Sequence, residues 1–234
     1  MKFAGTIVSA EETNGIEERI GAAAFAGRSL DVEIGRFAPK TYRVRLAVSP
    51  VKVQAPAFKT VALPYNKVAI SSNAFSAFGH MDKGWHSYAA EQIPEEILYR
   101  GVRFHTAKAD FDNAVACDGQ VLELPAGAKC VYLLVASAGQ DKDAVFTCGN
   151  DFKVHVPGWT GFFGGCYWEP YQPFLKDGDV AYVGPHRHDS ATRDEYYVQT
   201  YMYMVCIPAF YGATRLILPK DKDITVFAAE AQVD

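Results

Sequence analysis

The sequence lacks the features that mark several large classes of protein. It has no apolar run near the roughly 18 residues that span a bilayer, so we expect no membrane insertion. It has no lysine or arginine run, and its net charge of −4 argues against a nucleic-acid partner. The opening MKFAGTIVSAEE is too short and too polar for a secretory signal, which favours the cytoplasm as the compartment.

Motifs for common catalytic chemistry are also missing. There is no G-x-S-x-G nucleophile elbow and no phosphate-binding loop. The cysteines are odd in number, widely spaced and without a C-x-x-C pair, which excludes a zinc ribbon or a dense disulfide framework and predicts free thiols. From the residues we therefore expect no catalytic residue and no cofactor in this chain.

What the sequence does contain is an alternation of apolar and polar residues, interrupted by turn residues. The one helical candidate, residues 89–99, is interrupted by Pro94 and predicts only one or two turns. In YYVQTYMYMVCI both alternating sets are largely apolar, which predicts a central strand covered on both faces. We predict an all-β fold, an antiparallel β-sandwich with a small N-terminal β-meander.

Prolines divide the chain into two parts. Pro50, Pro56 and Pro64 interrupt any regular ladder and mark a linker or an edge crossing. We place the boundary near residue 50, so that residues 1–50 form the short β-meander and residues 51–234 the β-sandwich domain. Two segments of the second part, VLELPAGAKCVYLLVASAG and TRLILPKDKDITVFAAEA, each predict a hairpin.

A pair of histidines is the first candidate for chemistry. His186 and His188 are two residues apart, so on a strand they face the same way and could hold a metal ion together. A cupin-type site would add a glutamate four or five residues later, where Thr192 and Arg193 stand, and Glu195 comes too late. The alternative is that the pair ends a strand and hydrogen-bonds to neighbouring loops.

Aromatic residues supply the second candidate. GWTGFFGGCYWEPYQPF gathers large rings in an irregular, glycine-rich path, and such rings can stack on the apolar faces of sugars. This predicts a carbohydrate-binding platform of Trp159, Trp168 and Tyr171. The alternative is a plug that seals one end of the sandwich.

Several segments together resemble a known family. NGIEERIGAAAFAGRSL, GHMDKGWHSYAAEQIP, WTGFFG, VAYVGPHRHD and YVQTYMYMVCIP follow, in that order, the C-terminal β-rich part of bacterial α-mannosidases of glycoside hydrolase family 38. The resemblance covers nearly the whole chain from about Asn14. In that family the nucleophile and the zinc site belong to an N-terminal domain that is absent here, so the resemblance gives no catalytic or metal role to His186 or His188.

The resemblance implies a non-catalytic accessory β-sandwich module of a mannosidase-like, carbohydrate-active protein. An independent carbohydrate-binding module and a histidine-based metalloenzyme are the alternatives. The expected partners are a glycan and, through residues 1–50, a second copy of the chain or a catalytic polypeptide, because the edge of a sheet recruits further strands.

Overall fold

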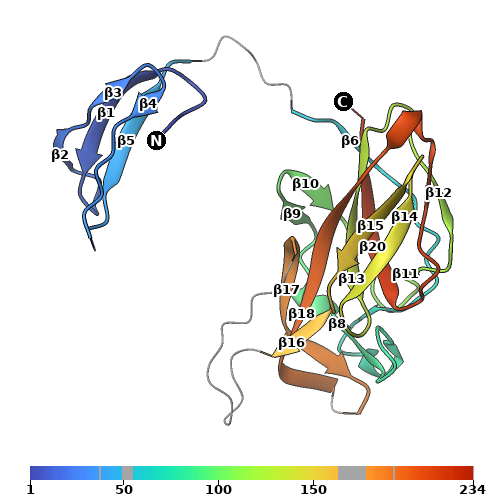
Figure 1. Ribbon diagram of the computed structural model, residues 1–234. Helices are drawn as coiled ribbons and strands as arrows, with labels where there is room; N and C mark the ends of the chain where they lie inside the picture. The colour runs from blue at the N-terminus through green and yellow to red at the C-terminus, as the bar shows by residue number, and fades with distance from the viewer. Residues whose placement is uncertain (37, 49–54, 163–177, 192, 234) are drawn as a thin grey trace. The chain divides into compact units, whose positions relative to one another are not determined.

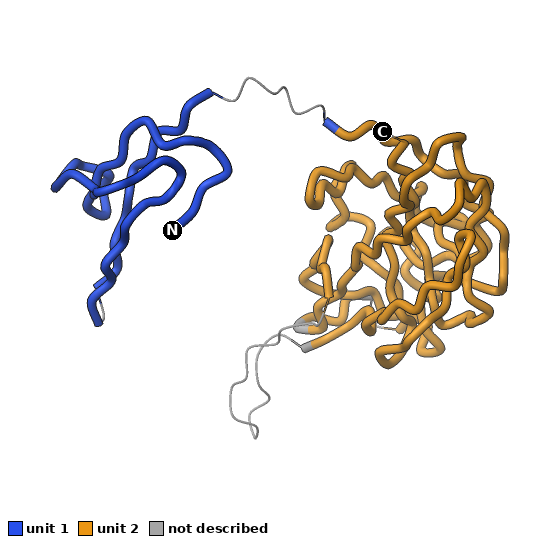
Figure 2. Tube along the Cα trace, turned by 45° about the horizontal axis from the view of Figure 1, so that its top comes forward, with its two compact units in different colours: residues 1–55 blue, residues 56–234 orange. Residues whose placement is uncertain are grey.

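The chain divides into two compact units, Met1–Ala55 and Pro56–Asp234 (Figure 2). The structure, a computed structural model, describes residues 1–36, 38–48, 55–162, 178–191 and 193–233 (Figure 1). Regular structure in these residues consists of β-strands and short 3-10 helices, which confirms the all-β prediction. No helix in this part of the chain is long and apolar enough to cross a membrane.

The smaller unit is built on one three-stranded antiparallel sheet of order β2-β1-β5, beside a hairpin of β3 and β4. The turn after β1 is formed by Asn14, whose Oδ1 accepts hydrogen bonds from the backbone N–H groups of Ile16 and Glu18 at 3.1 and 2.9 Å. Because β5 returns to the free edge of β1, the order differs from the predicted meander. The strands are β1 Ile7–Thr13, β2 Arg19–Ala22, β3 Phe25–Ala26, β4 Ser29–Leu30 and β5 Thr41–Leu46.

The larger unit contains a nine-stranded sheet, a four-stranded sheet and a two-stranded hairpin. Its strands are β6 Phe58–Thr60, β7 Ile70–Ser71, β8 His86–Ala89, β9 Ile97–Tyr99, β10 Val102–Phe104, β11 Val115–Ala116, β12 Val121–Glu123, β13 Cys130–Ser137, β14 Lys142–Thr147, β15 Asp151–Val156, β16 Thr160–Phe162, β17 Val180–Asp189, β18 Arg193–Pro208, β19 Arg215–Ile217 and β20 Ile224–Gln232. The 3-10 helices are η1 Ser76–Phe78, η2 Ala90–Gln92 and η3 Phe210–Gly212.

The main path of the large sheet is β11-β20-β13-β18-β17-β8-β7, with β16 beside β18 and β6 beside β20. The smaller sheet has the order β12-β19-β14-β15. Both predicted hairpins are therefore wrong: β12 and β13 belong to different sheets, and so do β19 and β20. The turn between each pair carries the chain across the sandwich, so that the two layers share one core.

That shared core explains why the central strands are apolar on both faces. β20 is buried from Ile224 to Ala231, and Tyr201 to Met204 of β18 are all buried. The four-stranded sheet adds Phe146 to the same cluster, and the β9–β10 hairpin, which contacts β20 and β17, adds Phe104. The predicted double-sided cover of β18 is confirmed.

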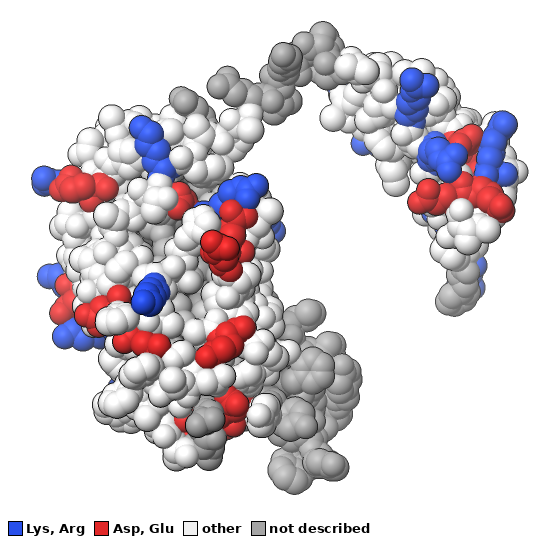
Figure 3. All heavy atoms as spheres, turned by 180° about the vertical axis from the view of Figure 1, so that it is seen from behind, with Lys and Arg blue, Asp and Glu red and all other residues white. Residues whose placement is uncertain are grey.

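Charged side chains lie interspersed on the surface of the larger unit, with acidic groups beside basic ones on the face seen in Figure 3. Lys153 and Asp143, for example, pair at 2.7 Å, and Arg215 and Glu123 pair at 3.0 Å. Exposed pairs of this kind contribute only about 0–1 kcal/mol each, so the stability of this unit rests on its core.

Candidate metal centre

The candidate site lies on the hairpin of β17 and β18. Its turn is fixed by Asp189, whose Oδ1 accepts a hydrogen bond from the Ala191 N–H at 2.9 Å. The β17 ladder is interrupted between Gly184 and His186, and Pro185, which has no N–H to donate, occupies the interruption. A Cβ at Gly184 would collide with the Thr200 hydroxyl of β18, so glycine is required there.

Beyond this bulge, His186 and His188 lie on one face of β17, with ring centroids 6.0 Å apart. The antiparallel register places Asp194 of β18 directly opposite His188. As a result the Nε2 atoms of both histidines lie 3.5 Å from one atom, Asp194 Oδ1. The three ligand atoms lie within 4.8 Å of one another.

Burial makes this arrangement chemically unusual. The His188 side chain is 0% exposed, and neither its Nε2 nor Asp194 Oδ1 has a hydrogen-bond partner among the described residues. Buried polar atoms are normally paired, because an unsatisfied one costs about 1–3 kcal/mol. Burial lowers the pKa of His188, and the nearby Glu91 and Asp194 carboxylates offset only part of that effect. A neutral imidazole presents a lone pair, which is the form that ligates a metal.

The other nitrogen of His188 is held by a serine pair. Nδ1 lies 3.1 Å from Ser71 Oγ, and Ser71 Oγ lies 2.6 Å from Ser87 Oγ. Both serines are fully buried, and they come from β7 and β8. An Nδ1–H that donates to Ser71 leaves Nε2 as the lone-pair nitrogen, and outer contacts of this kind orient metal-ligating histidines.

Two of the three spacings between the ligand atoms match those of a metal polyhedron. With Zn–N and Zn–O distances of about 2.0–2.1 Å, two ligands of a tetrahedral ion are about 3.3–3.5 Å apart. Both Nε2–Oδ1 distances here are 3.5 Å, which is long for a hydrogen bond of this type and correct for two ligands of one ion.

One carboxylate and one phenol lie beside the three candidate ligands. Glu91 of η2 places Oε2 3.8 Å from His188 Nε2, while its Oε1 accepts a hydrogen bond from the Asn73 N–H at 2.7 Å. Tyr196 donates to Asp194 Oδ2 at 3.4 Å, which leaves Oδ1 facing the histidines. Glu91 could therefore supply a further oxygen ligand, and Tyr196 orients the carboxylate.

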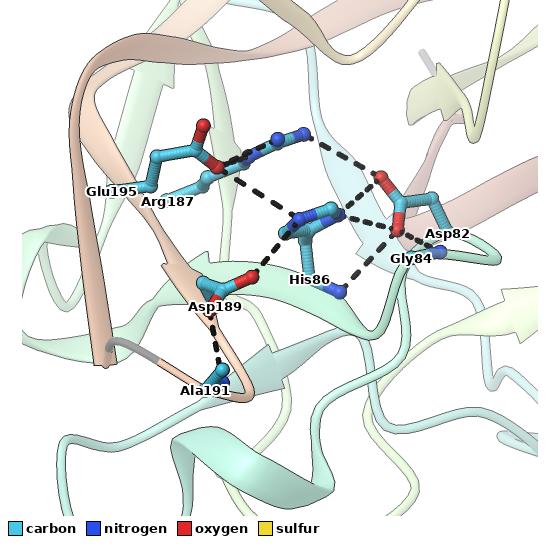
Figure 4. Close-up of polar contacts among 7 residues, drawn as sticks. All are labelled: Asp82, Gly84, His86, Arg187, Asp189, Ala191 and Glu195. Carbon is cyan, nitrogen blue, oxygen red and sulfur yellow. Dashed lines mark hydrogen bonds and ion pairs between the residues drawn. The ribbon is translucent and has the colours of Figure 1, made fainter.

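The opposite face of the same hairpin carries a second cluster, which is fully paired (Figure 4). His86 Nδ1 lies 2.8 Å from Asp82, and its Nε2 lies 3.2 Å from Asp189. Arg187 Nε and Nη2 both lie 2.7 Å from Glu195 Oε2. Because a guanidinium already neutralises Glu195, this cluster needs no metal ion even though His86, Asp189 and Glu195 lie close enough to hold one.

Of the three residues of the predicted aromatic platform, Trp159 belongs to the core. Trp159 is only 1% exposed and packs against Tyr88, with ring centroids 5.0 Å apart, so neither of its faces is open to a sugar. Trp168 and Tyr171 lie outside the described residues. Asp194 was not among the residues predicted from the sequence, because a cupin motif places its carboxylate at a fixed distance along the chain. The usable signal was the hairpin itself, since antiparallel pairing across its turn sets residue 194 opposite residue 188.

The fold and the site together define a β-sandwich domain with a two-histidine, one-carboxylate cluster on one hairpin. Residues 57–234 match the AziU2-like beta-sandwich domain family, so the chain belongs to that family. No curated protein matches the chain. The family match supports the β-sandwich part of the predicted resemblance and makes no link to α-mannosidases.

Proposed function

We propose that the larger unit binds one first-row divalent transition-metal ion through His186, His188 and Asp194. The observation that carries this proposal is the pair of unpartnered buried atoms, His188 Nε2 and Asp194 Oδ1, with His186 Nε2 at the same 3.5 Å spacing. Imidazole and carboxylate ligands suit Zn²⁺ and Fe²⁺, whereas Ca²⁺ and Mg²⁺ prefer sites made of oxygen alone.

Three protein ligands leave a coordination position open. Open positions are typical of catalytic sites, where the ion polarises a bound oxygen, while structural zinc sites are closed by four protein ligands. In this proposal Glu91 is either a fourth ligand or a base beside the open position, given its 3.8 Å distance from His188 Nε2. The metal centre thus makes this chain a candidate enzyme.

Metal analysis tests the proposal directly. Protein stripped with chelator, reloaded with Zn²⁺ and freed of excess ion should retain one Zn²⁺ per chain, and the double variant His186→Ala/His188→Ala should retain none. His86→Ala is the matched control, because it removes a histidine from the paired cluster on the opposite face and should leave the metal content unchanged. Wild-type protein that comes back without stoichiometric metal would overturn the proposal.

A carbohydrate-binding role, as an accessory module or on its own, is the second candidate, and one observation favours it. Trp85 is 56% exposed on a left-handed backbone position and lies beside His80, with ring centroids 5.9 Å apart. An exposed indole can stack on a sugar face. This role predicts that mannose or mannan changes the tryptophan fluorescence and that Trp85→Ala removes the change. The absence of any response across a glycan panel would count against it.

A further inference from the structure

A second region of the larger unit has the character of a ligand site. It is a cleft of about 560 Å³ whose lining includes Lys67, His80, Asp82, Lys83, Lys222 and Asp223. None of the three proposed metal ligands lines it. The cleft is within the size range of small-molecule sites, so its polar groups can be examined as recognition elements.

Lys67 is the unusual member of this lining, because a lysine is seldom buried without a charged partner. Lys67 is only 8% exposed. Its main-chain carbonyl oxygen accepts hydrogen bonds from the N–H groups of Asn113 and Ala114 at 2.9 and 3.1 Å. The amine Nζ lies 3.1 Å from Thr225 Oγ1 on β20, and in the described part of the chain it forms no ion pair within 4.0 Å. These bonds hold the main chain at Lys67, and its buried amine has no ion-pair partner among the described residues.

The two carboxylates that line the cleft are paired with side chains other than Lys67. Asp223 lies 2.7 Å from the amine of Lys142, and Asp82 holds His86. Burial accordingly lowers the pKa of Lys67 to about 8, and the more distant charges of Asp223 and Asp82 offset only part of that effect. At pH 7 roughly a tenth of this amine is unprotonated, which is the nucleophilic form, against well under 0.1% for a lysine at its ordinary pKa.

We propose that Lys67 is the reactive amine of this cleft and that the ligand of the cleft is a small aldehyde or ketone. The nitrogen lone pair attacks the carbonyl carbon and forms a C–N bond. Both amine protons then leave with the carbonyl oxygen as water, and a C=N bond remains, with no net oxidation or reduction. Lys83 and Lys222 line the same cleft, so a carbonyl compound that carries a carboxylate fits its charge. This inference does not depend on the metal centre.

The test uses the full chain with glyoxylate as the probe at pH 8, followed by borohydride reduction and peptide mass mapping. At this pH about half of Lys67 is free amine, against about 0.3% for a lysine at its ordinary pKa. We expect Lys67 to be alkylated at least tenfold faster than Lys83 or Lys222. Modification of Lys67 no faster than that of these neighbours would overturn the proposal.

Two variants separate this result from a folding defect. Lys67→Met keeps the length and the apolar stem of the side chain, so we expect it to fold and to lose the rapid phase of modification. Lys83→Met removes a lysine from the same cleft and should keep that phase. A rapid phase that survives in folded Lys67→Met would assign the reactivity to another amine and overturn the proposal.

Discussion

Asp194→Asn separates a metal site from a cluster of merely buried polar groups. Without metal, the substitution removes a carboxylate whose buried Oδ1 has no hydrogen-bond partner among the described residues. We expect the free energy of unfolding in chelator to be unchanged or to rise by about 1 kcal/mol, because the desolvation penalty of the charge is relieved.

With metal bound, we expect Asp194→Asn to be less stable than the wild type. Zn²⁺ at 100 times its dissociation constant stabilises a protein that binds it only when folded by about 2.7 kcal/mol. For a domain of this size that is a rise in Tm of about 5–10 °C. Loss of one of three ligands that weakens affinity about 100-fold leaves a gain of about 0.4 kcal/mol, or about 1 °C.

The assay is thermal unfolding in chelator and in Zn²⁺, with Glu195→Gln as the matched control. Glu195 is the next residue along β18, but it faces Arg187 on the opposite side of the hairpin. Its substitution should lower the baseline stability by about 1 kcal/mol and keep the whole Zn²⁺ shift. An equal Zn²⁺ shift in Asp194→Asn and in wild type would refute the assignment of Asp194 as a ligand.

Three further predictions address the core, the buried lysine and the smaller unit. Trp159→Ala should cost about 3–5 kcal/mol in denaturant unfolding, while Trp85→Ala stays within about 0.5 kcal/mol; similar costs would contradict their placements in the core and on the surface. The pKa of Lys67 is lowered to about 8 in the folded protein, so above pH 8 the unfolded chain binds more protons than the folded one. The free energy of unfolding should therefore rise by about 3 kcal/mol between pH 8 and 10.5 relative to Lys67→Met. Parallel pH profiles of the two proteins would refute this. Self-association through residues 1–50 should disappear when they are deleted, and a strictly monomeric full chain in light scattering would contradict it.

Much of the larger unit could be predicted from the sequence because strand patterning is local. The apolar residues on both faces of YYVQTYMYMVCI identified β18 as a central strand, and Tyr201 to Met204 are indeed buried. Sheet partners are not local, and this is where the prediction failed. Pro125 and Pro219 follow strands that were expected to fold back as hairpins, but the chain crosses to the other sheet at both turns.

The same division holds for the candidate sites. The two-residue spacing of His186 and His188 was enough to place them on one face, because side chains alternate along a strand. The large rings of the glycine-rich segment could not be divided from sequence into core and surface, and Trp159 proved to belong to the core. Burial depends on what packs above a residue, which its neighbours along the chain do not specify.

By itself, the sequence determined the all-β class and the shared direction of the two histidines, since each follows from the identity and spacing of nearby residues. Only the tertiary structure decided which acid faces them. The register of β17 against β18 sets Asp194 beside His188 and turns Glu195 toward Arg187, and the packing of β7 and β8 closes Ser71 and Ser87 over the other nitrogen. A shift of the register by one residue would exchange the two acids, because successive side chains on a strand point to opposite faces.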